Sequence, residues 1–250
     1  MKKILLSMSA VFLLSVSSAF AQIGNVPMYF NGGWQGNVWS GGPEGSVATG
    51  FYDGSINNVN VGPGQSSPGM ICDDYYDNIT SGEHWTATGY QVSTLNAGNI
   101  GNTLFGNAAG WSGLGFAGGL QGYEALAYLA NDMLKNAVGN PSLQSSISQA
   151  LWYLTSNANG SMKYPGIAFS SLDSGAQGLV KFVENTSNLS PLSMYSGLWL
   201  YTQPFNPNGP QEMWGQIPVP EGGAALAYLL LAGVSCFGAM FFRSQRQLRA

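Results

Sequence analysis

The sequence predicts an α+β fold: a β-rich extracellular domain with an inserted helical hairpin, plus one C-terminal transmembrane helix. Two observations predict the domain: short segments rich in aromatic and β-branched residues, and a central pair of segments with helical periodicity. A third observation predicts the membrane helix, because residues 223–242 form an apolar run without a charge.

The first 21 residues are expected to be a signal peptide. Two lysines precede a short apolar segment, and Ala19 and Ala21 are the small residues that flank a cleavage point. The mature chain would then begin at Gln22, and residues 22–217 would form one extracellular domain. We therefore expect an exported protein.

Charged residues make up only 8% of the chain, and the formal net charge is −4. Binding to nucleic acid needs clustered Lys and Arg, and no such cluster occurs between the two ends of the chain. The body is instead rich in Gly, Asn, Ser, Trp and Tyr, which suits β-structure with long polar loops. We expect neither a nucleic-acid partner nor a cofactor.

Strands are expected on both sides of the helices. Residues 47–62 read as two strands joined by a tight turn at Asp53-Gly54, and residues 70–76 and 83–95 read as further strands. After the helices, residues 197–203 and 210–217 read as closing strands of the same β-structure.

Two consecutive helices are expected within residues 123–159. The first ends near Gly139, and Asn140 then caps a second helix that has Pro141 at its first position. Trp152 lies opposite the apolar stripe of this second helix, which therefore should be covered on both sides. Residues 172–185 are a third helix candidate. The apolar stripe of the first helix consists of Leu126, Leu129, Ala130, Met133, Leu134 and Ala137, and that of the second helix consists of Leu143, Ile147, Ala150, Leu151 and Leu154.

The C-terminal segment, residues 218–250, resembles a PEP-CTERM sorting signal. The motif would lie at 218–223, the membrane span at 223–242 and the basic tail at 243–250, which places the C-terminus in the cytoplasm. The resemblance implies processing by an exosortase-type enzyme in a biofilm-forming Gram-negative bacterium. The protein would be anchored by the C-terminal helix, or released to the outer surface or extracellular matrix. The matching residues are Pro220, Glu221, Arg243 and Arg246, with Gly222 in place of the second proline.

The body resembles the TQXA-type thioester domains of bacterial surface adhesins. These domains join a strand cysteine to a helix glutamine, and surface amines attack the resulting thioester. Here "ICDD" contains Cys72 and "SQALW" matches the helix motif, but Ser148 stands four residues before Trp152, where the family has glutamine. Gln149 is displaced by one residue, or about 100° around a helix. The resemblance implies a related fold without the acyl donor, with a Cys72–Gln149 thioester as the alternative.

Cys72 is otherwise expected to be a small buried hydrophobic residue on a strand. A cysteine-dependent hydrolase would need Cys72 beside His84, the only histidine, and nothing in the sequence positions the two together. Pairing with Cys236 is excluded if that residue lies in the predicted membrane span.

Two further groups are weaker candidates for binding. Asp73, Asp74 and Asp77 form an acidic cluster that suits Ca²⁺, although their spacing matches no EF-hand loop. Four aromatic residues amid Gly and Asn are candidates for carbohydrate stacking, against a core role as the alternative; they are Trp34, Trp39, Trp111 and Tyr123.

The sequence therefore predicts a non-enzymatic, exosortase-sorted protein of the cell surface or extracellular matrix, with a structural or adhesive role. Its expected partners are the sorting enzyme, the membrane through residues 223–242, and a matrix polysaccharide or a surface amine.

Overall fold

The computed structural model describes residues 22–76, 79–159, 166–203 and 211–216, which all belong to one compact unit, Gln22–Val219. Within them the strands are β1 (Gln22–Trp34), β2 (Val38–Gly42), β3 (Gly45–Ala48), β4 (Phe51–Ile56), β5 (Val59–Val61), β6 (Met70–Cys72), β7 (His84–Gln91), β8 (Trp199–Thr202) and β9 (Met213–Gly215). The α-helices are α2 (Gly119–Asn136), α3 (Pro141–Asn159) and α4 (Ser174–Glu184). Short 3₁₀ helices are η1 (Val92–Thr94), η2 (Ile100–Asn102), η3 (Ala109–Leu114), η4 (Phe169–Ser171), η5 (Thr186–Asn188) and η6 (Leu192–Met194).

Six antiparallel strands form a sheet that closes on itself. The strand order is β1-β7-β8-β9-β6-β4, and β1 also pairs with β4, which completes the ring. In that last pairing Phe30 lies opposite Gly54, and Trp34 lies opposite Tyr52. Strands β5 and β6 both pair with β4 along the edge opposite to β1. Closure leaves β1 and β4 without the free edges of an open sheet.

The closed sheet buries side chains on both of its faces. Met70 and Cys72 of β6 lie in a cluster inside the ring, whereas Ile71 between them packs outward against the helices. The same alternation holds in β8, where Tyr201 lies inside and Leu200 outside. This double burial explains why the short strands are apolar and aromatic at successive positions rather than at alternate ones.

The hairpin turn within residues 47–62 lies at Asn57-Asn58, so the prediction of a turn at Asp53-Gly54 was wrong. Both asparagines have positive φ angles, 50° and 63°, which is the backbone of a type I′ turn. Gly54 lies inside β4 instead, because only a residue without a side chain fits beside the backbone of β1 at that position.

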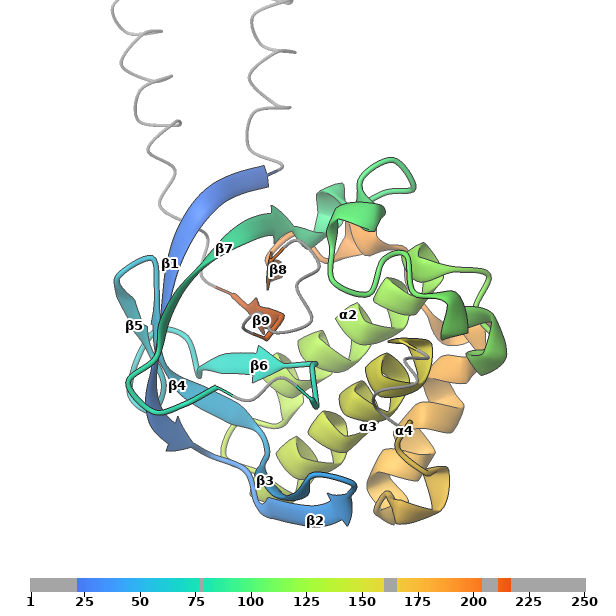
Figure 1. Cartoon of the computed structure of the whole chain (residues 1–250), viewed down its shortest axis with the longest axis horizontal. Helices are drawn as coiled ribbons and strands as arrows, with labels where there is room; N and C mark the ends of the chain where they lie inside the picture. Colours follow the sequence, from blue (N-terminus) through green and yellow to red (C-terminus); the bar gives the residue numbers. More distant parts are fainter. Residues whose placement is uncertain (1–21, 77–78, 160–165, 204–210, 217–250) are drawn as a thin grey trace, which may run out of the picture. The chain divides into compact units, whose positions relative to one another are not determined.

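Three α-helices cover the outer face of the sheet on one side (Figure 1). The predictions of helices around 123–141, 141–159 and 172–185 are confirmed, although α2 begins four residues before the first of these segments. The Asn140 side chain accepts a hydrogen bond from the Leu143 backbone N–H at 3.1 Å, as its predicted capping role requires. Trp152 is buried opposite the apolar stripe of α3, so this helix is covered on both sides.

The predicted fold class as a whole was wrong. We expected a β-rich extracellular domain with an inserted helical hairpin, plus one C-terminal transmembrane helix. The structure instead has a closed sheet packed against a layer of three helices. None of the described helices combines the length and the apolar character needed to cross a bilayer, and the predicted span at 223–242 lies outside the described residues. Strand closure is a long-range pairing between β1 and β4, which local patterns do not encode.

Candidate functional site

The Cys72 side chain lies inside the ring of strands, only 1% exposed. Its thiol donates a hydrogen bond to the Asp74 carbonyl O at 3.0 Å, and the Trp152 indole N–H lies close enough to stabilise a thiolate. Burial nevertheless raises the pKa of Cys72 well above its ordinary value, and the negative charge of Asp74 raises it further. At neutral pH the group is therefore a protonated, shielded thiol and a poor nucleophile.

Gln149 faces the interface between α3 and α4, away from the interior of the ring. Its Nε2 donates to Asp173 Oδ2 at 2.8 Å and to Ser145 Oγ at 3.2 Å. Its Oε1 accepts the Asp173 backbone N–H at 2.9 Å, beside the start of α4. The side-chain amide is thus fully engaged in holding α4 against α3, and the structure does not bring it to Cys72.

Ser148, one residue earlier, faces the sheet. Its hydroxyl accepts the Gly50 backbone N–H at 2.9 Å, close to the start of β4. Position 148 is also one helical turn before Trp152, which lies beside Cys72. The helix therefore presents position 148, rather than position 149, to the side on which the cysteine lies, and serine cannot supply an acyl group.

We expect Cys72 to remain a free, unreactive thiol in the folded protein. Iodoacetamide should label it only after unfolding, because burial excludes the reagent and keeps the thiol protonated. Peptide mapping by mass spectrometry separates Cys72 from Cys236, and the intact mass should show no loss of ammonia (about 17 Da) from a thioester. Such a loss, or rapid labelling of the native protein, would overturn this assignment.

A pair of buried carboxyl groups, Asp73 and Glu212, joins the sheet to the helices. Both residues are 0% exposed. Glu212 Oε1 accepts the Tyr123 hydroxyl at 2.6 Å, and Oε2 accepts the Leu104 backbone N–H at 3.0 Å. Asp73 Oδ2 accepts the Trp214 indole N–H at 2.7 Å. The network therefore ties α2 and the loop before it to the ends of β6 and β9.

We infer that the two carboxyl groups share one proton. Each is fully buried, the negative charge of one disfavours a negative charge on the other, and Asp73 Oδ1 accepts no hydrogen bond from the described residues. Glu212 receives more donors, since Thr202 also bonds to it. Burial, and then the charge of Glu212, raise the pKa of Asp73 well above its ordinary value. We therefore assign the proton to Asp73 and the negative charge to Glu212.

The acidic cluster does not form a calcium site among the described residues. Asp73 belongs to the buried pair, and Asp74 Oδ1 accepts the Tyr76 backbone N–H at 3.1 Å. Asp77 lies outside the described residues. In the described part of the chain, no group of three or more His, Cys, Asp and Glu side chains is placed to hold a metal ion.

Of the four aromatic residues considered for carbohydrate stacking, three are core residues. Trp39, Trp111 and Tyr123 are at most 8% exposed, and only Trp34 is substantially exposed, at 46%. Trp111 donates its indole N–H to the Phe105 carbonyl O at 2.7 Å, which anchors the loop before α2. The proposed stacking surface of four rings is therefore wrong.

His84 is not placed beside Cys72. It is exposed at the start of β7, and its ring stacks on Tyr29 with 4.4 Å between the ring centroids. Cys72 is buried inside the ring of strands, with Asp74 and Trp152 as its polar neighbours. The structure therefore does not assemble the cysteine–histidine pair that a hydrolase needs.

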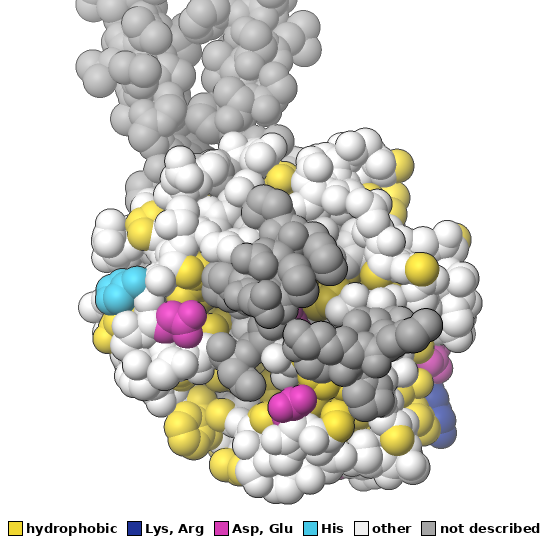
Figure 2. All heavy atoms as spheres, in the orientation of Figure 1, with side chains coloured by type: hydrophobic (Ala, Val, Ile, Leu, Met, Phe, Trp, Pro, Cys, Tyr) yellow, Lys and Arg dark blue, Asp and Glu magenta, His cyan; other side chains and the backbone are white. Residues whose placement is uncertain are grey.

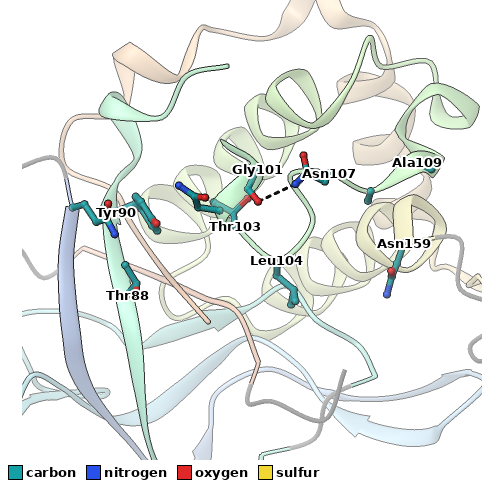
Figure 3. Close-up of a pocket in the computed structure, with 11 residues that line it drawn as sticks. Thr88, Tyr90, Gly101, Thr103, Leu104, Asn107, Ala109 and Asn159 are labelled. Carbon is teal, nitrogen blue, oxygen red and sulfur yellow. Dashed lines mark hydrogen bonds between the residues drawn. The ribbon is translucent and has the colours of Figure 1, made fainter. Parts of the chain in front are cut away.

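A cleft of about 720 Å³ lies between β7, the loop around η2 and the end of α3 (Figure 3). None of the described residues that line it carries a charge. Asn107 Nδ2 donates to the Gly101 carbonyl O at 3.0 Å, which shapes one wall, and Leu104 and Ala108 add an apolar area. The described polar side chains that line the cleft are Gln22, Thr88, Tyr90, Asn102, Thr103, Asn107 and Asn159.

The sequence analysis missed both this cleft and the buried acid pair. Glu212 directly precedes the apolar residues Met213 and Trp214 in the predicted strand 210–217, and a carboxylate in a buried strand signals a paired or protonated group. The cleft gave no comparable signal, because its amides come from three separate segments. The predicted sorting residues Pro220, Glu221, Gly222, Arg243 and Arg246 lie outside the described residues, as does the signal peptide.

Comparison with known proteins gives no relative from which to assign this site. No family model matches the chain, and neither the curated proteins nor the solved structures contain a match to it.

Proposed function

We propose that this chain is an exported, non-enzymatic binding protein of the cell surface or extracellular matrix, and that its cleft at β7 binds uncharged polysaccharide. The observation that carries the proposal is that amide and hydroxyl groups line that cleft and that none of its described lining residues is charged. An amide offers both a donor and an acceptor, which suits the hydroxyl groups of a sugar. A cleft of about 720 Å³ has room for a few sugar units.

The surface composition supports a neutral ligand. Charged side chains are few on the face shown in Figure 2, where uncharged polar groups and backbone predominate. Asn102 and Asn107 are exposed and Asn159 is half-buried, so their amides are accessible. Leu104 and Ala108 provide an apolar area on which the C–H face of a sugar ring can pack. Anionic polysaccharides would find no cationic side chain among the described residues of this lining.

The proposed location follows from the two ends of the sequence. The leader-like residues 1–21 support export, and the motif-like residues 218–223 support processing by an exosortase-type enzyme. A non-enzymatic role fits the chemistry of the described residues, in which the only thiol is buried and the only histidine is exposed and stacks on Tyr29.

A binding measurement on a double variant, in which two amide side chains of the cleft are removed together, tests this function. Neutral oligosaccharides of glucose and of N-acetylglucosamine are titrated against the purified full-length protein by calorimetry, with alginate as an anionic counterpart. Replacing Asn102 and Asn159 together with alanine should weaken binding about tenfold, since each lost hydrogen bond contributes roughly 0.5–1.5 kcal/mol.

Asn60 provides the matched control for these variants. It is an exposed asparagine on β5 and does not line the cleft. Asn60→Ala should bind the oligosaccharides as the unaltered protein does. The proposal fails if alginate binds better than the neutral sugars, or if the double variant and the control lose affinity equally.

A further inference from the structure

A second cavity, of about 320 Å³, lies where β1, β3 and β4 meet the end of β6 and helix α3. It is separate from the amide-lined cleft, with which it shares no lining residue. Five of its lining residues are aromatic. The rings of Phe30 and Tyr52 pack edge to face at 5.6 Å between centroids, and those of Tyr75 and Trp152 lie 5.5 Å apart. The aromatic lining consists of Phe30, Trp34, Tyr52, Tyr75 and Trp152.

The cavity has a negative electrostatic character. Among the described lining residues Asp74 alone carries a charge, and it is 7% exposed. Cations interact favourably with the faces of aromatic rings, most strongly where water is excluded. A buried carboxylate within an aromatic wall therefore favours an organic cation over a neutral or anionic ligand.

The available hydrogen-bond acceptors limit which cation fits. Asp74 Oδ1 already accepts the Tyr76 backbone N–H. A primary ammonium group brings three N–H donors that all need acceptors when buried. A quaternary ammonium group brings none, and its methyl groups pack directly on aromatic rings. Five aromatic residues and one partly engaged carboxylate thus match a quaternary ammonium better than a primary one.

One buried acceptor in the wall remains unused. Gln211 is 6% exposed and lines the cavity, and its Oε1 receives no donor from the described part of the chain. An unpaired buried carbonyl is destabilising by about 1–3 kcal/mol, which a ligand donor would relieve. The ligand that fits carries one hydroxyl in addition to its cationic group.

We propose that this cavity binds a quaternary ammonium ligand that carries a hydroxyl group, with choline as the simplest probe. The cationic group occupies the aromatic wall near Asp74, and the hydroxyl donates to Gln211 Oε1. This site is independent of the amide-lined cleft, so the failure of one proposal leaves the other standing.

Two probes of the same shape test the proposal. Choline and 3,3-dimethyl-1-butanol, its uncharged analogue, are titrated against the full-length protein by calorimetry and by tryptophan fluorescence, since Trp34 and Trp152 line the cavity. Choline should bind at least about tenfold more tightly than the alcohol, because only the cation gains from the rings and from Asp74. Equal binding of the two probes, or no binding of choline, would overturn the proposal.

Two variants locate the binding within the cavity. Trp34→Leu removes an exposed ring at the rim, and Asp74→Asn removes the charge; each should weaken choline binding about tenfold. Phe182→Leu is the matched control, because Phe182 is 41% exposed on α4 and does not line the cavity. If Asp74→Asn does not fold, Trp34→Leu still decides: unchanged choline affinity in that variant contradicts the proposal.

A further comparison distinguishes free choline from the phosphocholine headgroup of lipids as the ligand, since both carry a quaternary ammonium group. Phosphocholine adds a phosphate that Asp74 should repel, so free choline should bind more tightly. Tighter binding of phosphocholine would contradict the charge argument.

Discussion

Replacing Glu212 with glutamine should destabilise the domain by about 3 kcal/mol, because a buried, charged acceptor becomes a neutral amide. The carboxylate accepts the Tyr123 hydroxyl and the Leu104 backbone N–H on its two oxygens. A glutamine has one oxygen, so one of these donors would face an NH₂ group. Both lie in the buried contact between the sheet and α2, where no solvent replaces the lost partner.

The isosteric change of the partner, Asp73→Asn, should be nearly neutral at pH 7. Asparagine copies the protonated carboxyl: its NH₂ donates to Glu212, and its oxygen accepts the Trp214 indole N–H. The contrast between the two variants depends on the assignment of the shared proton to Asp73. If Asp73→Asn is the more damaging of the two, the proton resides on Glu212 instead.

The same pair should make the domain less stable as the pH rises. Burial raises the folded-state pKa of Asp73 and of Glu212, so the folded protein holds a proton that the unfolded chain releases above about pH 4. The stabilisation is fully present below the unfolded pKa and is lost as the pH rises through the folded pKa. The free energy of unfolding should fall by up to about 1.4 kcal/mol per pH unit within that window.

Urea unfolding followed by tryptophan fluorescence between pH 4 and pH 9 measures this slope. Asp73→Asn should flatten it, because the variant has no shared proton to release. An unaltered slope in Asp73→Asn would assign the pH dependence to other carboxyl groups, such as the half-buried Glu124 and Glu184, whose pKa values partial burial also raises.

Replacing Gly54 with alanine should destabilise the domain by about 3 kcal/mol or more, by opening the ring of strands. Gly54 pairs with Phe30 where β4 meets β1. A Cβ atom at this position would overlap the Tyr29 carbonyl O and lie 2.9 Å from Met70 Cε. The carbonyl belongs to the backbone of the neighbouring strand, so the overlap is relieved only if the two strands separate.

Gly24→Ala is the matched control for this change. Gly24 also lies in a strand, β1, but a Cβ atom there has no neighbour within 4 Å. Thermal unfolding of the two variants should show a large decrease in Tm for Gly54→Ala and almost none for Gly24→Ala. Equal Tm values would mean that the β1–β4 pairing does not hold the ring closed.

The three α-helices could be predicted from sequence because their signals are local. The apolar stripe from Leu126 to Ala137, the Asn140 cap and Pro141 each act within a few residues, and the structure has helices at these places. The hairpin turn was misplaced because Asp53-Gly54 is a common turn dipeptide. Gly54 is instead required by the backbone of β1, about 25 residues earlier in the chain.

The candidate sites were less predictable. The helix motif around Gln149 correctly drew attention to α3, and the one-residue displacement proved decisive, because Gln149 binds Asp173 while Ser148 faces the sheet. The buried Asp73–Glu212 pair joins residues 139 positions apart, and the two cavities are each lined by several separate segments. Single-segment patterns carry no information about which segments meet.

The sequence by itself determined the helices, the apolar character of the strands and the charge-poor, amide-rich composition of the body, because each of these depends on residue type and local spacing. Only the tertiary structure decided that the sheet closes between β1 and β4, that Cys72 and Gln149 have different partners, and that Asp73 shares a proton with Glu212. The physical reason is the same in each case. The closure of the sheet, the side-chain contacts and the burial of the carboxyl pair each involve segments distant in the chain. They exist only once the strands have paired and the helices have covered the sheet.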